Sequence, residues 1–149
     1  MKIFHRRKTA IFFALIIGLI IVYLLLSHNS NSKSAIINYV QNNKSELETY
    51  VQDISADEKT YTDIYNNWNV SYYQNSGVVE FLVSTGGLGS SSKYYGFYYS
   101  PQNIPMGYQE QNVKLLENET GWQWSDPNGD NQYYTEKIAD NWYWFEMDF

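Results

Sequence analysis

Residues 94–100 read YYGFYYS, and this aromatic stretch decides what the rest of the fold must accommodate. Alternate side chains of a strand point to opposite faces, so Tyr95 and Tyr99 share one face while Tyr94 and Tyr98 share the other. A strand between one helix and solvent needs only one apolar face, yet both faces here are aromatic. The sequence therefore predicts a sheet with more aromatic surface than one helix can cover, and a surplus exposed as a binding patch. The alternative is that all of these rings are core.

Short segments that alternate or are rich in aromatic residues surround this stretch and are separated by turns such as QNSG, PQNIP and DPNGD. They predict strands at residues 68–73, 78–83, 113–117, 121–125, 132–138 and 142–149. Before them, Ile37, Val40, Leu47, Val51 and Ile54 recur at helical spacing and predict one amphipathic helix over residues 34–55. A coiled coil is a marginal alternative, because Lys44 interrupts the seam. The predicted fold class is α+β, with this helix packed on an antiparallel meander of five to seven strands.

An unbroken apolar run, AIFFALIIGLIIVYLLL, occupies residues 10–26 and follows a basic N-terminus. As a helix this run is about 25 Å long, close to the thickness of a bilayer core. The basic residues predict a cytoplasmic N-terminus, and a single-pass cell-membrane protein with its C-terminal part outside. Cleavage of the run as a signal peptide near Ser32 or Ser34 is the alternative. The expected organisation is a cytoplasmic segment 1–9, a signal anchor 10–27, a linker 28–33 and an extracytoplasmic α+β domain 34–149.

Charge and composition exclude several classes of function. From residue 28 onward the chain has six basic and sixteen acidic residues, a net charge of −10, which disfavours nucleic acid as a partner. The chain has no cysteine, and its two histidines, His5 and His28, precede the predicted domain. Ser-His-Asp and Cys-His catalysis, thiol redox chemistry and histidine-bound zinc are therefore not expected in that domain.

Carboxylates are the remaining candidates for chemistry. Glu80 and Glu110 are flanked by aromatic residues in a way that could place them in a pocket, although solvated surface charge is the commoner arrangement. Residues 126–131, DPNGDN, have the one-three-five oxygen spacing of a calcium loop. They lack its glycine at position six and its glutamate at position twelve, so a hairpin turn is favoured over weak calcium binding. We expect no catalytic residues, no metal and no cofactor.

The predicted binding residues are aromatic: Tyr94, Tyr95, Tyr98, Tyr99, Trp122 and Trp124. One face of the YYGFYYS strand is expected to be core. The other is expected to form a partly exposed groove with Trp122 or Trp124 and the loop TGGLGSSS at residues 85–92. Gly96 on that face would leave room for a ligand or a crossing chain.

The set VVEF, the Gly/Ser loop, YYGFYYSP, GWQW, DPNGDN, YTEKI and NWYWFEMDF, within residues 78–149, resembles a C-terminal domain of exported or membrane-anchored proteins of Gram-positive bacteria. No activity is assigned to that domain, so the resemblance implies a location and no function.

Two functions of different class fit these features. The first is a non-catalytic, membrane-tethered, extracytoplasmic binding module that presents an aromatic sheet face to a protein, peptide or cell-wall glycan. The second is a small membrane-anchored immunity protein that intercepts a toxin or bacteriocin. A carboxylate-based hydrolase is a third, less favoured alternative, because it needs two facing acids across a cleft.

Overall fold

A computed structural model describes residues 15–19, 33–56, 61–88 and 91–149. The chain divides into two compact units, residues 1–32 and residues 33–149. In the first unit, residues 15–19 are helical, and the rest of the predicted anchor lies outside the described residues. Among the residues described, no helix combines the length and the apolar character needed to cross a membrane.

The second unit begins with two helices, α2 (Lys33–Asn42) and α3 (Lys44–Ala56), where the sequence predicted one. Asn43 interrupts the helix, and its side-chain Nδ2 donates to the backbone oxygen of Tyr39 at 2.8 Å. A short polar side chain that bonds nearby backbone competes with helical geometry, which explains the break. The predicted apolar face is otherwise correct, except that Ile36 is buried while Ile37 is only half-buried. The buried helical residues are Ile36, Val40, Leu47, Val51 and Ile54.

Within the described residues eight antiparallel strands form one sheet, so the α+β class is confirmed while the predicted count of five to seven is too low. The strands are β1 (Tyr61–Tyr65), β2 (Trp68–Tyr73), β3 (Val78–Leu88), β4 (Ser91–Tyr99), β5 (Leu116–Glu117), β6 (Trp122–Ser125), β7 (Gln132–Ala139) and β8 (Trp142–Asp148). The added strand is β1, which turns into β2 through Asn66 and Asn67. Both of these residues have positive φ, as a two-residue hairpin of type I′ requires.

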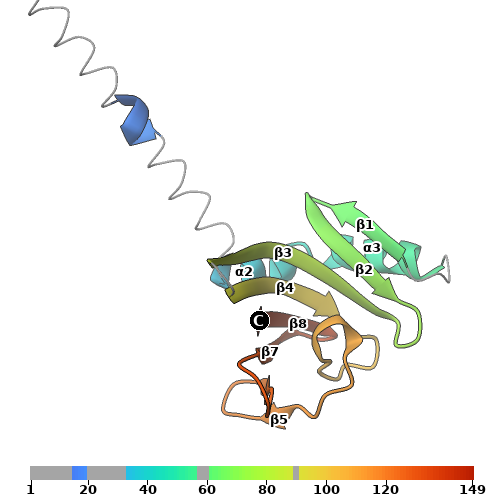
Figure 1. Ribbon diagram of the computed structural model, residues 1–149. Coiled ribbons are helices and arrows are strands. Elements are labelled where there is room, and N and C mark those ends of the chain that lie inside the picture. The colour runs from blue at the N-terminus through green and yellow to red at the C-terminus, as the bar shows by residue number, and fades with distance from the viewer. Residues whose placement is uncertain (1–14, 20–32, 57–60, 89–90) are drawn as a thin grey trace, which may run out of the picture. The chain divides into compact units, whose positions relative to one another are not determined.

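The sheet is not one meander. Its order is β1-β2-β3-β4-β8-β7-β6-β5, so two four-stranded meanders meet where β4 pairs with β8. The chain leaves β4 at Ser100, crosses to the far edge through residues 100–115, which include the short 3-10 turn η1 (Tyr108–Glu110), and re-enters at β5. Figure 1 shows both helices on one side of the sheet and this connection, in orange, on the other.

Each face of the sheet has its own core. The helix-covered face packs Phe81, Phe97 and Trp142 against the helices, and the Phe81 and Phe97 rings stack 4.5 Å apart. The opposite face buries a second cluster, which consists of Val78, Tyr98, Tyr108, Tyr133, Tyr143, Phe145 and Met147. From the sequence, only the helix was expected to cover a face of the sheet. In the structure, the connection formed by residues 100–115 covers the second face.

Gly96 does not leave room for a ligand. The Phe145 ring on the paired strand lies over it, and a Cβ at this position would come within 2.7 Å of that ring and 2.1 Å of the Phe81 carbonyl oxygen. Glycine is therefore required here by close packing inside the protein, and the expectation of space for a crossing chain is wrong.

Candidate functional site

The six predicted binding aromatics do not lie on one surface. Tyr95 and Tyr99 pack against the helix-side core, whereas Tyr94, Tyr98, Trp122 and Trp124 belong to the opposite face. Tyr98 is only 2 % exposed and is a core residue, whereas the other five are half-buried. The TGGLGSSS segment continues β3 and β4 as a strand extension, and it does not line the cavity described below. Its residues 89 and 90 lie outside the described residues.

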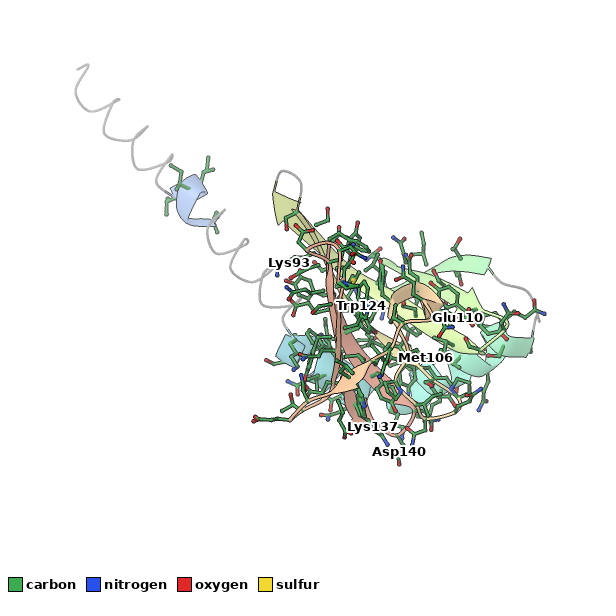
Figure 2. The ribbon with its side chains drawn as sticks, turned by 60° about the horizontal axis from the view of Figure 1, so that its bottom comes forward. Lys93, Met106, Glu110, Trp124, Lys137 and Asp140 are labelled. Atoms are coloured by element: carbon green, nitrogen blue, oxygen red, sulfur yellow. The ribbon has the colours of Figure 1, made fainter. Side chains whose placement is uncertain are left out.

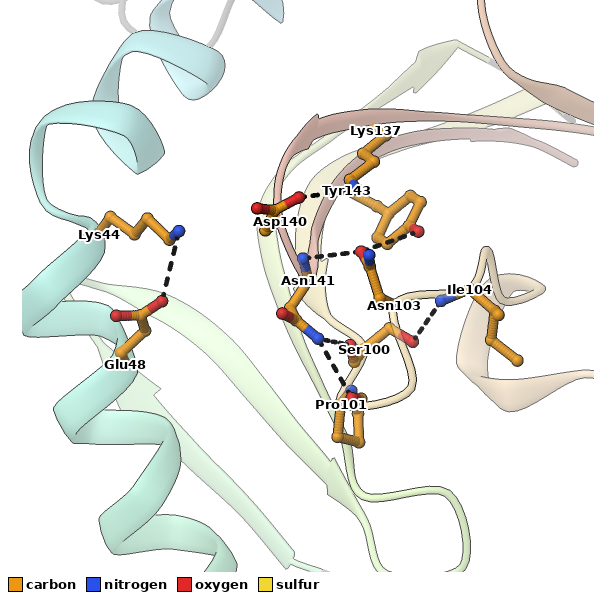
Figure 3. Close-up of polar contacts among 10 residues, drawn as sticks. All are labelled: Lys44, Glu48, Ser100, Pro101, Asn103, Ile104, Lys137, Asp140, Asn141 and Tyr143. Carbon is orange, nitrogen blue, oxygen red and sulfur yellow. Dashed lines mark hydrogen bonds and ion pairs between the residues drawn. The ribbon is translucent and has the colours of Figure 1, made fainter.

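The connection is fixed to the second face at its start by asparagine side chains (Figure 3). Asn141, in the turn between β7 and β8, donates from Nδ2 to the backbone oxygens of Ser100 and Pro101 at 2.8 and 3.1 Å. Its backbone nitrogen donates to Asn103 Oδ1 at 2.9 Å. Both Asn103 and Asn141 have positive φ, which asparagine tolerates better than most residues. These bonds satisfy the backbone where the chain leaves the sheet.

Two buried tyrosines hold the middle of the connection. The Tyr98 hydroxyl accepts a hydrogen bond from the Met106 backbone nitrogen, and the Tyr133 hydroxyl donates to the Met106 carbonyl, both at 2.9 Å. Thr135 Oγ1 donates to the Trp144 carbonyl, so Tyr98 donates its own proton to Thr135 Oγ1, 2.9 Å away. Burial raises the pKa of both tyrosines well above the usual value, so they remain neutral donors. Tyr98 and Tyr133 therefore both hold the connection in place through Met106.

A buried carboxylate supports the next part. Glu80, 6 % exposed, projects from β3 into the second face, where its Oε2 accepts a hydrogen bond from the Gln109 backbone nitrogen at 3.0 Å. Burial raises the pKa of Glu80 to about 7, and the Gln109 bond opposes that rise only in part. Burial also raises the pKa of Tyr108, to about 12, and the charge of Glu80 adds to this rise. Of the two acids considered from sequence, Glu80 is thus buried and not solvated.

The backbone is strained at the turn that Glu80 holds by its hydrogen bond to Gln109. Gln109 and Glu110 have φ of 50° and 59°, a left-handed conformation that costs a residue other than glycine roughly 1–3 kcal/mol. Two adjacent residues of this kind persist only where their surroundings hold them. Here the Glu80 carboxylate holds Gln109, and the Glu110 nitrogen donates to the Gly107 carbonyl at 3.1 Å.

A cavity of about 530 Å³ opens beside this strained turn. Met106 and Glu110, both labelled in Figure 2, belong to its lining, as does Trp122 of β6. Of the other lining residues, Pro105, Val113 and Leu115 are apolar, and Gly107, Gln111 and Asn112 complete the set. A volume of this size is typical of ligand sites, and the lining is apolar and polar in about equal parts. We call it the Trp122 cavity.

The Trp122 cavity is lined by apolar side chains, two amides and one carboxylate. Glu110 is the one carboxylate among its lining residues, so these residues provide no facing pair of acids.

Within the described part of the chain no cluster of three or more potential metal ligands occurs. At the DPNGDN turn, Asp126 Oδ1 accepts from the Asn128 nitrogen at 2.8 Å, as in an Asx turn.

Sequence reasoning identified Trp122 and considered Glu110, but it missed the rest of the lining. Met106 lies in an irregular segment without strand or helix periodicity, so no pattern marked it as a packed residue. Val113 and Leu115 fall within the predicted strand 113–117, but the observed strand β5 covers only Leu116–Glu117, and both residues belong to the irregular connection. The local signal was the aromatic and apolar content of residues 104–108, IPMGY, which include Pro105 and closely follow Pro101.

Comparison with known proteins supplies no relative: the chain matches no family model, no curated protein and no solved structure.

Proposed function

We propose that residues 33–149 form a non-catalytic binding module, tethered to the outer face of a cell membrane, that holds an apolar side chain of a protein or peptide partner in the Trp122 cavity. The observation that carries this proposal is the cavity itself, with its half-buried tryptophan beside a strained turn. Half-buried tryptophans anchor many interfaces because they offer a large apolar surface. Backbone strain clusters at binding sites more often than elsewhere.

The charge of the module favours a neutral or basic partner. The net charge from residue 28 onward is −10, and Glu110 places one carboxylate at the cavity. A peptide with a large apolar residue beside Lys or Arg would fill the cavity and pair with Glu110, while an acidic peptide would be repelled.

The tether is proposed from the sequence. The run at residues 10–26 has the length and composition of a signal anchor, and the basic residues before it favour a cytoplasmic N-terminus. Leu15 and Leu19 within this run are 62 % and 70 % exposed, which is consistent with a helix that needs apolar surroundings.

Peptide display on the full chain, kept in non-ionic detergent, tests the proposal. We expect selected peptides to carry a large apolar residue with adjacent basic residues, and Trp122→Ala to weaken their binding by at least about tenfold. The matched control is Trp124→Ala, which removes a half-buried tryptophan from the same strand and face without touching the cavity lining. Selected peptides that bind wild type and Trp122→Ala equally would refute the proposal.

A further inference from the structure

A second hollow lies on the helix side of the sheet, formed by two rows of polar side chains. One row runs Gln123, Tyr134 and Glu146 across β6, β7 and β8, and the other runs Ser125, Gln132 and Asp148 across the same strands. We call these six residues the polar platform. They line a pocket of about 210 Å³, together with Trp124 and Tyr133, which the alternation of the strands assigns to the other face.

Lys93 on β4, labelled in Figure 2, pairs with both carboxylates of the platform. Its Nζ lies 2.8 Å from Asp148 Oδ2 and 3.4 Å from Glu146 Oε1. One lysine between two carboxylates leaves a local charge of −1 and keeps both acids in fixed positions. It also occupies the place where a cation would bind between them. Asp148 Oδ1 is buried and has no hydrogen-bond partner among the described residues, whereas the partly exposed Glu146 carboxylate keeps oxygen lone pairs for further donors.

The side chain of Tyr134, the aromatic residue of the platform, is also held in place by polar contacts. The Tyr134 hydroxyl donates to Glu136 Oε2 at 3.0 Å and lies 2.6 Å from Thr120 Oγ1. Lys33 Nζ, 5.4 Å from the centre of the Tyr134 ring, pairs with the same Glu136 at 2.6 Å. The ring is thus oriented by contacts outside the pocket.

We propose that the polar platform binds a neutral saccharide, with room for one sugar ring. Adjacent sugar hydroxyls are paired donors and acceptors, and the platform opposes them with amides, carboxylates and hydroxyls on neighbouring strands. The flat Tyr134 side chain adds apolar surface for the C–H groups of a sugar ring. An anionic ligand is disfavoured by the two carboxylates and by the acidic module around them. The platform pocket and the Trp122 cavity share no lining residue, so the two sites can be tested separately.

Saturation-transfer NMR on the full chain, in a detergent without a sugar headgroup, tests the inference. The probes are glucose, galactose, mannose, N-acetylglucosamine and its disaccharide, with N-acetylneuraminic acid as the anionic comparison. We expect transfer to at least one neutral sugar, with affinity reduced at least about tenfold in Gln132→Ala and Asp148→Asn. The control Gln102→Ala changes an exposed glutamine away from both sites and should bind like wild type.

Absence of transfer to every neutral probe at millimolar concentration would overturn the inference, as would equal binding by Gln132→Ala and Gln102→Ala. A preference for the anionic sugar would do the same. Trp122→Ala should leave sugar binding intact, so failure here is separable from failure of the peptide site.

Discussion

Replacement of Glu80 by glutamine should make the protein more stable at alkaline pH. Glu80 is buried in an aromatic cluster, where its carboxylate accepts a hydrogen bond from the Gln109 nitrogen. A glutamine can accept the same bond through its amide oxygen but cannot ionise. Burial raises the carboxyl pKa from 4.5 to about 7, so folding favours the protonated form.

The size of the effect follows from that shift. Each unit of pKa difference between the folded and unfolded states corresponds to about 1.4 kcal/mol, so the rise in pKa costs wild type about 3–4 kcal/mol once Glu80 is ionised in both states. Because the folded pKa is the higher one, the stability is fully present below pH 4.5 and is lost as the pH rises through about 7. At about pH 4 the two proteins should differ by less than about 1 kcal/mol.

Urea unfolding of the full chain, followed by tryptophan fluorescence between about pH 4 and pH 9 at constant ionic strength, measures this difference. All other titrating groups are common to both proteins, so the difference isolates Glu80. Glu119→Gln, at an exposed position, should follow wild type at every pH. If Glu80→Gln showed the same pH dependence as wild type, the carboxylate would have to be solvated or paired, and the account of the second core would be wrong.

Three further predictions concern the core and the topology. Leu47→Ala should lower the free energy of unfolding by about 2–5 kcal/mol, measured by urea unfolding, because Leu47 is fully buried under the sheet; a loss under about 0.5 kcal/mol would contradict this. Gly96→Ala should lose more than about 2 kcal/mol in the same assay, because the added methyl meets Phe145 and a carbonyl oxygen, and wild-type stability would contradict the close packing. Protease added to intact cells should digest residues 33–149, and full protection of that part would reverse the proposed orientation.

Local pattern was enough to predict most of the elements. Alternating apolar or aromatic residues and turn-forming segments marked seven of the eight described strands, and periodicity marked the helical face through Val40, Leu47, Val51 and Ile54. The strand β1 was missed because YTDIY alternates weakly and follows a charged stretch. The break at Asn43 was missed because the apolar spacing continues across it with only a local change in hydrogen bonding.

The same local patterns could not predict the tertiary arrangement of the strands. Pairing of β4 with β8 joins residues about fifty positions apart, and no local signal specifies it. The sequence correctly predicted more aromatic surface than one helix can cover, but not that the irregular connection covers part of it, so Tyr98 is a core residue. The hydrogen-bond donor to Glu80 is the backbone nitrogen of Gln109, which lies 29 positions along the chain in a segment without periodicity.

The most direct test of the central claim is chemical-shift mapping of the full chain with a peptide selected by display. We predict that peptide binding shifts the backbone amides of residues 106–115 and the indole N–H of Trp122, and leaves those of α2 and α3 unchanged. Shifts confined to the helices or to the β1 edge would show that the partner binds elsewhere and that the Trp122 cavity is not the binding site.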